Sequence, residues 1–188
     1  MDRMLTEAPM GGGGDATPNG ARKARLFWGT VIVVVLVDVV TKVVAVAGLR
    51  PRGFPHDVIG HAVRLTLVYN PGAAFGLFLG PLSRWIFLGL TVGVLCILRV
   101  LYRATPDGDL ARVLALGLVC GGALGNLIDR VRSPMGVVDF IDVGIRDLRW
   151  PTFNVADMAV SVGAVLLAWV LWGEDRHRET SAAPIPEV

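Results

Sequence analysis

Four long apolar segments separated by polar connections dominate this chain. They cover residues 26–49, 85–103, 110–129 and 153–172. Because a helix needs about 20 mostly apolar residues to cross a bilayer, each segment predicts a transmembrane helix. The third segment is interrupted most often by small and polar residues, so hydropathy alone supports it least.

Polar sequence flanks this apolar region at both ends. Residues 1–25 are glycine-rich and residues 174–188 are polar with proline, so we expect two disordered tails around a membrane domain of residues 26–173. The first span is too long for a signal peptide, and it contains Asp38 and Lys42. We therefore expect it to be retained as a helix.

An even number of spans places both tails on the same side of the membrane. Basic residues divide almost evenly between the two sides, so the positive-inside rule decides little. The exception is the cluster Arg22, Lys23 and Arg25 directly before the first span, which favours cytoplasmic tails.

A short alternating stretch stands out between the first two spans. Apolar and polar side chains alternate over residues 63–69, and this period of two predicts a half-buried strand. Asn70, Pro71 and Gly72 follow as a turn signal, in which the glycine allows close backbone approach.

Composition excludes several classes of function. Hydrophobic residues make up 53% of the chain, and a net charge of +2 is too small to predict a nucleic-acid partner. Cys96 and Cys120 both lie within spans, and the three histidines lack metal-ligand spacing. We expect no metal site, no disulfide and no cofactor.

Polar residues inside the spans are candidates for chemistry, and each also has a structural explanation. Asp38 and Lys42 lie four residues apart, so they can pair on one helix face. Asn126 and Asp129 share a face in a glycine-rich segment that favours close helix packing. Arg130 next to them suits the C-terminal end of a helix.

Three further polar residues lie near the fourth span. Asp139 is flanked by apolar neighbours, where burial would raise the pKa of a carboxyl group, but a solvated loop acid explains it equally well. Asn154 can cap the fourth helix, and Asp157 in its first turn suits the helix dipole.

Together these acids and asparagines meet at one membrane face. Two carboxylates that share a proton can hydrolyse an amide, because one accepts a proton from water while the other donates one. Two alternatives stay open at this point. Asp38, Lys42 and Asp157 could form the relay of a small ion or proton transporter, or the glycine-rich span could assemble a non-enzymatic scaffold.

Five ordered motifs, between Asp38 and Gly163, are more specific than any single residue: DVVTK, YNPGAAFGLF, GGALGNLIDR, GVVDFIDV and FNVADMAVSVG. In these motifs the chain resembles the bacterial lipoprotein signal peptidases, the signal peptidase II family. The resemblance implies an all-α membrane protein with four transmembrane helices, a small extracytoplasmic β-sheet cradle and an active-site loop. It also implies a membrane aspartic endopeptidase that removes the signal peptide from diacylglyceryl-modified prolipoproteins on the N-terminal side of the lipidated cysteine.

The resemblance further assigns roles to residues. It implies that Asp139 and Asp157 are the catalytic acids. The residues that it implies for substrate binding or support are Asn70, Gly72, Asn126, Asp129, Arg130, Asn154, Asp38 and Lys42. It implies no metal, an active site toward the extracytoplasmic face of the inner membrane, and cytoplasmic termini.

The resemblance also sets expectations for partners. Prolipoprotein substrates and membrane lipids are the expected partners, and we expect a monomer. The implied cradle fits the strand at residues 63–69, and we expect the extended substrate segment to dock by backbone hydrogen bonds near this cradle.

Overall fold

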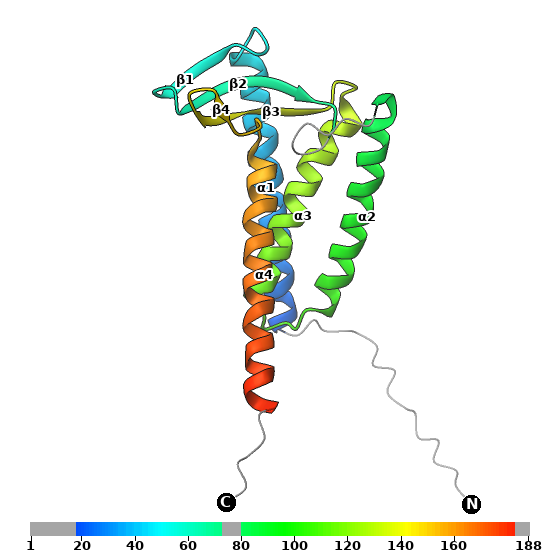
Figure 1. Cartoon of the computed structure of the whole chain (residues 1–188). Helices are drawn as coiled ribbons and strands as arrows, with labels where there is room; N and C mark the ends of the chain where they lie inside the picture. The colour runs from blue at the N-terminus through cyan, green and yellow to red at the C-terminus, as the bar shows by residue number, and fades with distance from the viewer. Residues whose placement is uncertain (1–17, 73–79, 183–188) are drawn as a thin grey trace, which may run out of the picture.

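The computed structural model describes residues 18–72 and 80–182 of the chain. Its elements, in chain order, are α1 (Pro18–Gly48), β1 (Pro55–Ile59), β2 (Val63–Asn70), α2 (Ser83–Ala104), α3 (Leu110–Arg132), β3 (Val137–Ile145), β4 (Leu148–Arg149) and α4 (Val155–Ala182). Figure 1 shows the four helices side by side, with the sheet lying across one end of the bundle. All four are long and apolar enough to cross a membrane, which confirms the predicted four-helix architecture with a small sheet.

The first helix extends beyond the predicted span. α1 begins at Pro18 rather than at Leu26, so the last part of the expected disordered tail is helical. Lys23 explains this difference. Its ammonium is buried, donates to the carbonyl of Thr105 and lies 3.4 Å from a carboxylate oxygen of Asp107. The loop after α2 therefore holds the first turns of α1 in place.

The other helix ends also differ from the hydropathy pattern. α4 continues to Ala182, into the tail that was expected to be disordered from residue 174, and an ion pair between Arg112 and Glu174 ties it to α3. α3 ends at Arg132 rather than at residue 129, and α4 starts at Val155 rather than at residue 153. Hydropathy does not register the ion pair of Arg112 and Glu174, which supports the continuation of α4 past the predicted span.

The bundle is organised around α3, which packs against the other three helices. Its glycines permit this. A Cβ at Gly121 would lie 2.8 Å from the side chain of Val34 on α1, and one at Gly122 would lie 2.3 Å from the carbonyl oxygen of Ala156 on α4. The packing explanation for the glycine-rich segment is therefore confirmed.

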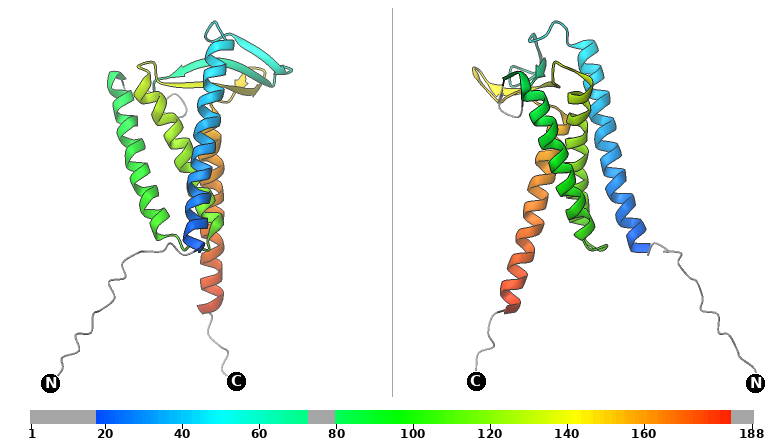
Figure 2. Two further views of the ribbon diagram at one scale, coloured as in Figure 1. Left: turned by 180° about the vertical axis from the view of Figure 1, so that it is seen from behind. Right: turned by 90° about the vertical axis from the view of Figure 1, so that its right-hand side faces the viewer.

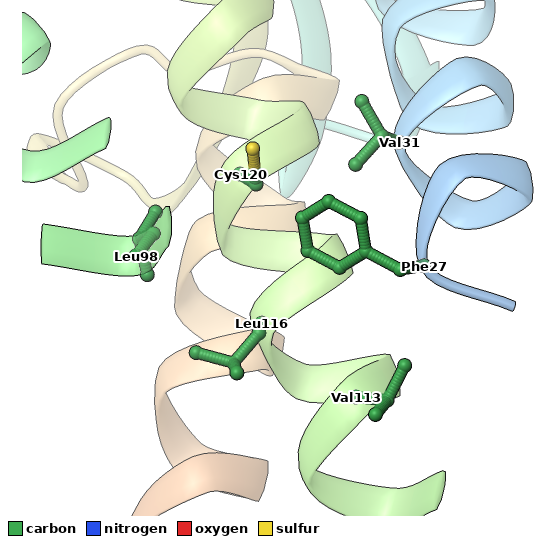
Figure 3. Packing of buried hydrophobic residues seen from close by; sticks show 6 residues of the cluster. All are labelled: Phe27, Val31, Leu98, Val113, Leu116 and Cys120. Atoms are coloured by element: carbon green, nitrogen blue, oxygen red, sulfur yellow. The ribbon is translucent and has the colours of Figure 1, made fainter. Parts of the chain in front are cut away.

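A compact apolar cluster joins three of the helices near the end of the bundle away from the sheet. Figure 3 shows its side chains converging from α1, α2 and α3: Phe27, Val31, Leu98, Val113, Leu116 and Cys120. Large apolar side chains elsewhere on the helices, such as Val44 and Trp169, are exposed, as expected for surfaces that face lipid.

The strands form one antiparallel sheet in the order β1-β2-β3-β4. β2 is the strand predicted from alternation, and the two views of Figure 2 show the sheet extending across the bundle end. Asn70 at the end of β2 pairs with Val137 at the start of β3. Gly136 allows this close approach, because it has a positive φ of 98° and a Cβ there would lie 2.1 Å from the carbonyl oxygen of Asn70.

The central position of β2 limits where a substrate strand could dock on the cradle. β1 pairs with β2 from Val63 to Thr66, and β3 pairs along its other edge. Both edges of this part of β2 are occupied, so a substrate strand has no free edge along residues 63–66. The rest of the motif that begins at Tyr69 falls on residues 73–79, which lie outside the described residues.

We expect Gly122→Ala to destabilise the fold, because the added methyl group would overlap the carbonyl oxygen of Ala156 and push α4 away from α3. Overpacking of this kind costs about 1–3 kcal/mol. Thermal unfolding in detergent micelles measures the effect. Gly89→Ala on α2 is the matched control, since a Cβ there meets nothing within 4 Å. Equal midpoints for the two variants would contradict the proposed packing.

Candidate active site

The start of α4 is built by a reciprocal pair of hydrogen bonds. The side-chain carbonyl of Asn154 accepts the backbone N–H of Asp157 at 2.9 Å, and the Asp157 carboxylate accepts the backbone N–H of Asn154 at 3.2 Å. This is the geometry of a capping box. The predicted cap therefore exists, and it also holds the carboxylate of Asp157 at the helix N-terminus, where the dipole favours negative charge.

Asp139 lies within strand β3 and is only 2% exposed. Its two carboxylate oxygens each accept an amide N–H, one from Asn70 at 3.1 Å and one from Asn154 at 2.7 Å. The alternative of a solvated loop acid is therefore excluded. Asp139 and Asp157 are called the acid pair below.

Burial and, second to it, the negative charge of Asp157 raise the pKa of Asp139 to about 7. The hydrogen bonds from Asn70 and Asn154 act against this shift, because they favour the carboxylate. A carboxyl group in this position is protonated in a large fraction of molecules at neutral pH.

Two asparagines connect the acid pair. The amide nitrogen of Asn154 donates to Asp139 and also to the side-chain oxygen of Asn126 at 3.1 Å. The amide nitrogen of Asn126 then donates to Asp157 at 2.7 Å. Residues from β3, α3 and α4 are thus joined through side-chain amides.

An ion-pair cluster of Asp38, Lys42 and Asp129 lies behind these asparagines. The Lys42 ammonium is 2.8 Å from a carboxylate oxygen of each acid. The other oxygen of Asp38, which is fully buried, accepts the N–H of Ala156 in the first turn of α4 at 2.9 Å. Asp129 also accepts the N–H of Val138 at 3.2 Å. The predicted ion pair therefore positions both α4 and β3.

Arg130 and Gly72 complete the predicted set. The guanidinium of Arg130 donates to the carbonyl of Gly72 at 3.2 Å and to the backbone carbonyl of Asn126 at 3.3 Å. The side-chain oxygen of Asn70 accepts the N–H of Gly72 at 3.0 Å. All ten residues proposed from the sequence lie in this one region of the structure.

A cavity of about 570 Å³ opens onto the acid pair. Its polar wall contains Asn70, Asn126 and Arg130 together with the acids. Its apolar wall comes from the segment before α4 and from α4 itself: Trp150, Pro151, Phe153, Met158, Val160 and Val162. Sequence reasoning missed this wall, although the dense apolar residues on both sides of Asp157 were a signal for it.

Asp142, the other acid of β3, has a different environment. Its carboxylate accepts hydrogen bonds from Arg149 at 2.5 Å and from Thr66 at 3.1 Å, and it does not line the cavity. This acid holds neighbouring strands together. Within residues 18–72 and 80–182, no group of three or more histidine, cysteine or acidic side chains is arranged to hold a metal ion.

Comparisons with known proteins place the chain in a family. The family model described as signal peptidase (SPase) II matches residues 30–173. The lipoprotein signal peptidase of Moorella thermoacetica is 44% identical over 142 residues, which cover 74% of this chain and 88% of that protein. The lipoprotein signal peptidase of Mycobacterium tuberculosis is 41% identical over 167 residues, which cover 86% of this chain and 78% of that protein.

A solved structure is also similar. It is described as a bacterial membrane enzyme determined by the in meso method at 2.3 Å resolution, and it superimposes with a TM-score of 0.71 at 33% sequence identity. The match covers 86% of this chain and 93% of that one.

The raised pKa of Asp139 predicts a pH-dependent stability. An acid whose pKa is higher in the folded protein than in the unfolded chain stabilises the fold fully below about pH 4, its unfolded pKa, and that contribution is lost as the pH rises through about 7. Asp139→Asn removes this titration. We therefore expect the variant to gain thermal stability relative to the parent between pH 5 and pH 9, as measured by unfolding midpoints in detergent. A constant difference across this range would contradict the burial of a titrating Asp139.

Proposed function

The chain belongs to the signal peptidase II family, and we propose that Asp139 and Asp157 are the catalytic acids of this aspartic-type endopeptidase. Enzymes of this family act on prolipoproteins in the bacterial inner membrane, so the peptidase interpretation replaces the transporter and scaffold alternatives. The observation that carries the assignment is the cavity, onto which both carboxylates open while amide donors hold them in place.

The chemistry follows from the protonation of the acid pair. With a pKa of about 7, Asp139 carries the proton, and Asp157 is the carboxylate that accepts a proton from the attacking water. The water oxygen bonds to the scissile carbonyl carbon while Asp139 donates its proton to the carbonyl oxygen. The tetrahedral intermediate then collapses: the C–N bond breaks, the proton held by Asp157 passes to the leaving amine, and a hydroxyl proton returns to Asp139 as the carbonyl re-forms. No covalent intermediate with the protein forms.

The surrounding amides set the positions of both acids. Asn70 and Asn154 hold the two oxygens of Asp139, whereas Asn126 and the N–H of Asn154 hold those of Asp157. Fixed reactants lower the barrier because the entropy of bringing them together is lost before the reaction.

The apolar wall of the cavity suits a substrate that remains in the membrane. Met158 and Val162 belong both to the cavity and to the exposed face of α4. The lipid chains of a diacylglyceryl cysteine would stay in the bilayer beside this face and place the bond on the N-terminal side of that cysteine against the acid pair. Membrane lipids are therefore partners of the proposed reaction.

We place the sheet and the acid pair on the extracytoplasmic side and both ends of the chain in the cytoplasm. Arg22, Lys23 and Arg25 lie at the end of the bundle opposite the sheet, as do Arg103 and Arg112. Cytoplasmic loops are enriched in such residues. We propose that residues 26–173 are the peptidase domain, which agrees with the family match over residues 30–173, and that the enzyme acts as a monomer.

Asp139→Asn and Asp157→Asn should each abolish catalysis, because each removes one half of the proton exchange. General acid or base catalysis contributes about 10²–10⁴-fold to a rate, so we expect losses of at least that size. Purified protein in detergent is incubated with a diacylglyceryl-modified precursor, and the shortened product is quantified.

Asp142→Asn is the matched control for this test, since it changes an acid of the same strand that lies outside the cavity. We expect it to retain cleavage at moderate temperature while unfolding earlier, because its contact with Arg149 is weakened. Near-normal turnover by either acid-pair variant would refute the proposed assignment.

The pH profile provides a separate check on Asp139. We expect kcat/KM to fall as the pH rises through about 7, because the proton of Asp139 is then lost. Asn70→Ala removes a donor that favours the carboxylate, so the alkaline limb should move to higher pH. Thr66→Val on the same strand does not contact Asp139 and should leave the limb in place. An unmoved limb in Asn70→Ala would argue against Asp139 as the proton donor.

A further inference from the structure

The buried ammonium of Lys42 has three acceptors around it. Two are carboxylate oxygens of Asp38 and Asp129, each at 2.8 Å, and the third is the side-chain oxygen of Asn126 at 3.0 Å. An ammonium group has three N–H donors, and three acceptor oxygens lie within 3.0 Å of this one. Ion pairing alone needs only the first two contacts, and the third connects Lys42 to the acid pair.

This third contact determines which way the amide of Asn126 points. Its oxygen accepts from Lys42 and from Asn154, so its nitrogen faces Asp157 and donates at 2.7 Å. A rotated amide would place its N–H groups against the ammonium of Lys42 and its oxygen against the carboxylate of Asp157. Both contacts would be repulsive, and in a buried site such errors are costly.

We propose that Lys42 is a positioning residue whose ammonium fixes the orientation of the Asn126 amide and thereby holds Asp157 as the carboxylate that accepts the proton from water. The proposal rests on the proposed function, because it assigns a role relative to the acid pair. Lys42 itself is 3% exposed and does not line the cavity, whereas Asn126 does. Lys42 therefore acts through Asn126 and not on the substrate.

Several charged groups lie around the acid pair. Asp139 is contributed by β3, and the negative charge of Asp157 helps to raise the pKa of Asp139. Arg130 on α3 interacts favourably with both acids. The ion-pair cluster adds Lys42 and Asp38 from α1, and Asp129 from α3. Lys42 is the cation of this cluster, and it is linked to Asp157 through a single amide.

The test uses the double variant Lys42→Met/Asp38→Asn. It removes one positive and one negative charge, so the net charge of the cluster stays the same. The asparagine oxygen at position 38 can still accept the N–H of Ala156, and methionine keeps most of the length of lysine. The full-length variant is purified in detergent, and the pH profile of kcat/KM is measured with a diacylglyceryl-modified precursor.

We expect kcat to fall about 10- to 100-fold with little change in KM, as for the loss of a hydrogen bond that orients a charged group. The acidic limb of the profile should move to higher pH, because an Asn126 amide that is free to rotate no longer keeps an N–H donor against the carboxylate of Asp157. An unmoved acidic limb would overturn the proposal even if kcat fell, since a merely structural role reduces activity without shifting the profile.

Lys23 on the same helix provides a control for the loss of a buried lysine. Lys23 is a second buried lysine of this helix, but its ammonium contacts only the loop after α2, at the opposite end of the bundle. Lys23→Met should lower the unfolding midpoint and leave both limbs of the pH profile unchanged. An equal shift of the acidic limb in Lys23→Met would also overturn the proposal, because it would show that lost stability alone moves the profile.

Lys42→Gln/Asp38→Asn is a second variant that carries the test if the methionine variant does not fold. Its neutral amide can still donate to Asn126 and keep the Asn126 amide oriented, so the acidic limb should stay close to that of the parent. A clearly raised limb in this variant would contradict the proposal, because the orienting hydrogen bond is present. If the acid-pair variants are inactive and the methionine variant keeps a parental profile, the proposed function stands and only the role of Lys42 is wrong.

Discussion

The site depends on the hydrogen bonds of the Asn154 side-chain amide. It caps α4 through its oxygen and donates through its nitrogen to Asp139, to Asn126 and to the backbone carbonyl of Val138. A carboxylate withdrawn from water needs hydrogen-bond donors to remain in place. Because one fully buried side chain serves a helix end, a strand and a neighbouring helix, the fold and the acid pair form together.

Close backbone approach around this amide explains the small residues nearby. Gly122 and Gly125 leave room on α3 for the start of α4 and for the carboxylate of Asp38, and Gly136 lets the end of β2 reach the start of β3. Larger side chains at these positions would separate the elements that carry the acids. The glycines are therefore part of the geometry of the site, although none of them takes part in proton transfer.

Much of this arrangement could be predicted from local patterns. Hydropathy located the four helices, alternation located β2, and the ordered motifs gathered the ten candidate residues. The pattern could not locate the start of α1 or show that α4 continues past residue 173, because Lys23 and Glu174 have partners far away in the chain. It also could not show that β1 occupies one edge of β2, or that Trp150 and Met158 form a wall of the cavity. Such facts depend on contacts between distant segments, which periodicity does not encode.

The bond between Asp38 and the N–H of Ala156 has a consequence for biogenesis. It joins Asp38 on the first membrane helix to Ala156 on the last. Asp38 can therefore form this hydrogen bond only after α4 has been synthesised. Until α4 has inserted, the chain holds Asp139 without Asp157 or Asn154. If the acid pair is catalytic, as proposed, a nascent chain therefore cannot hydrolyse peptides beside it in the membrane, and activity arises only when synthesis of the bundle is complete.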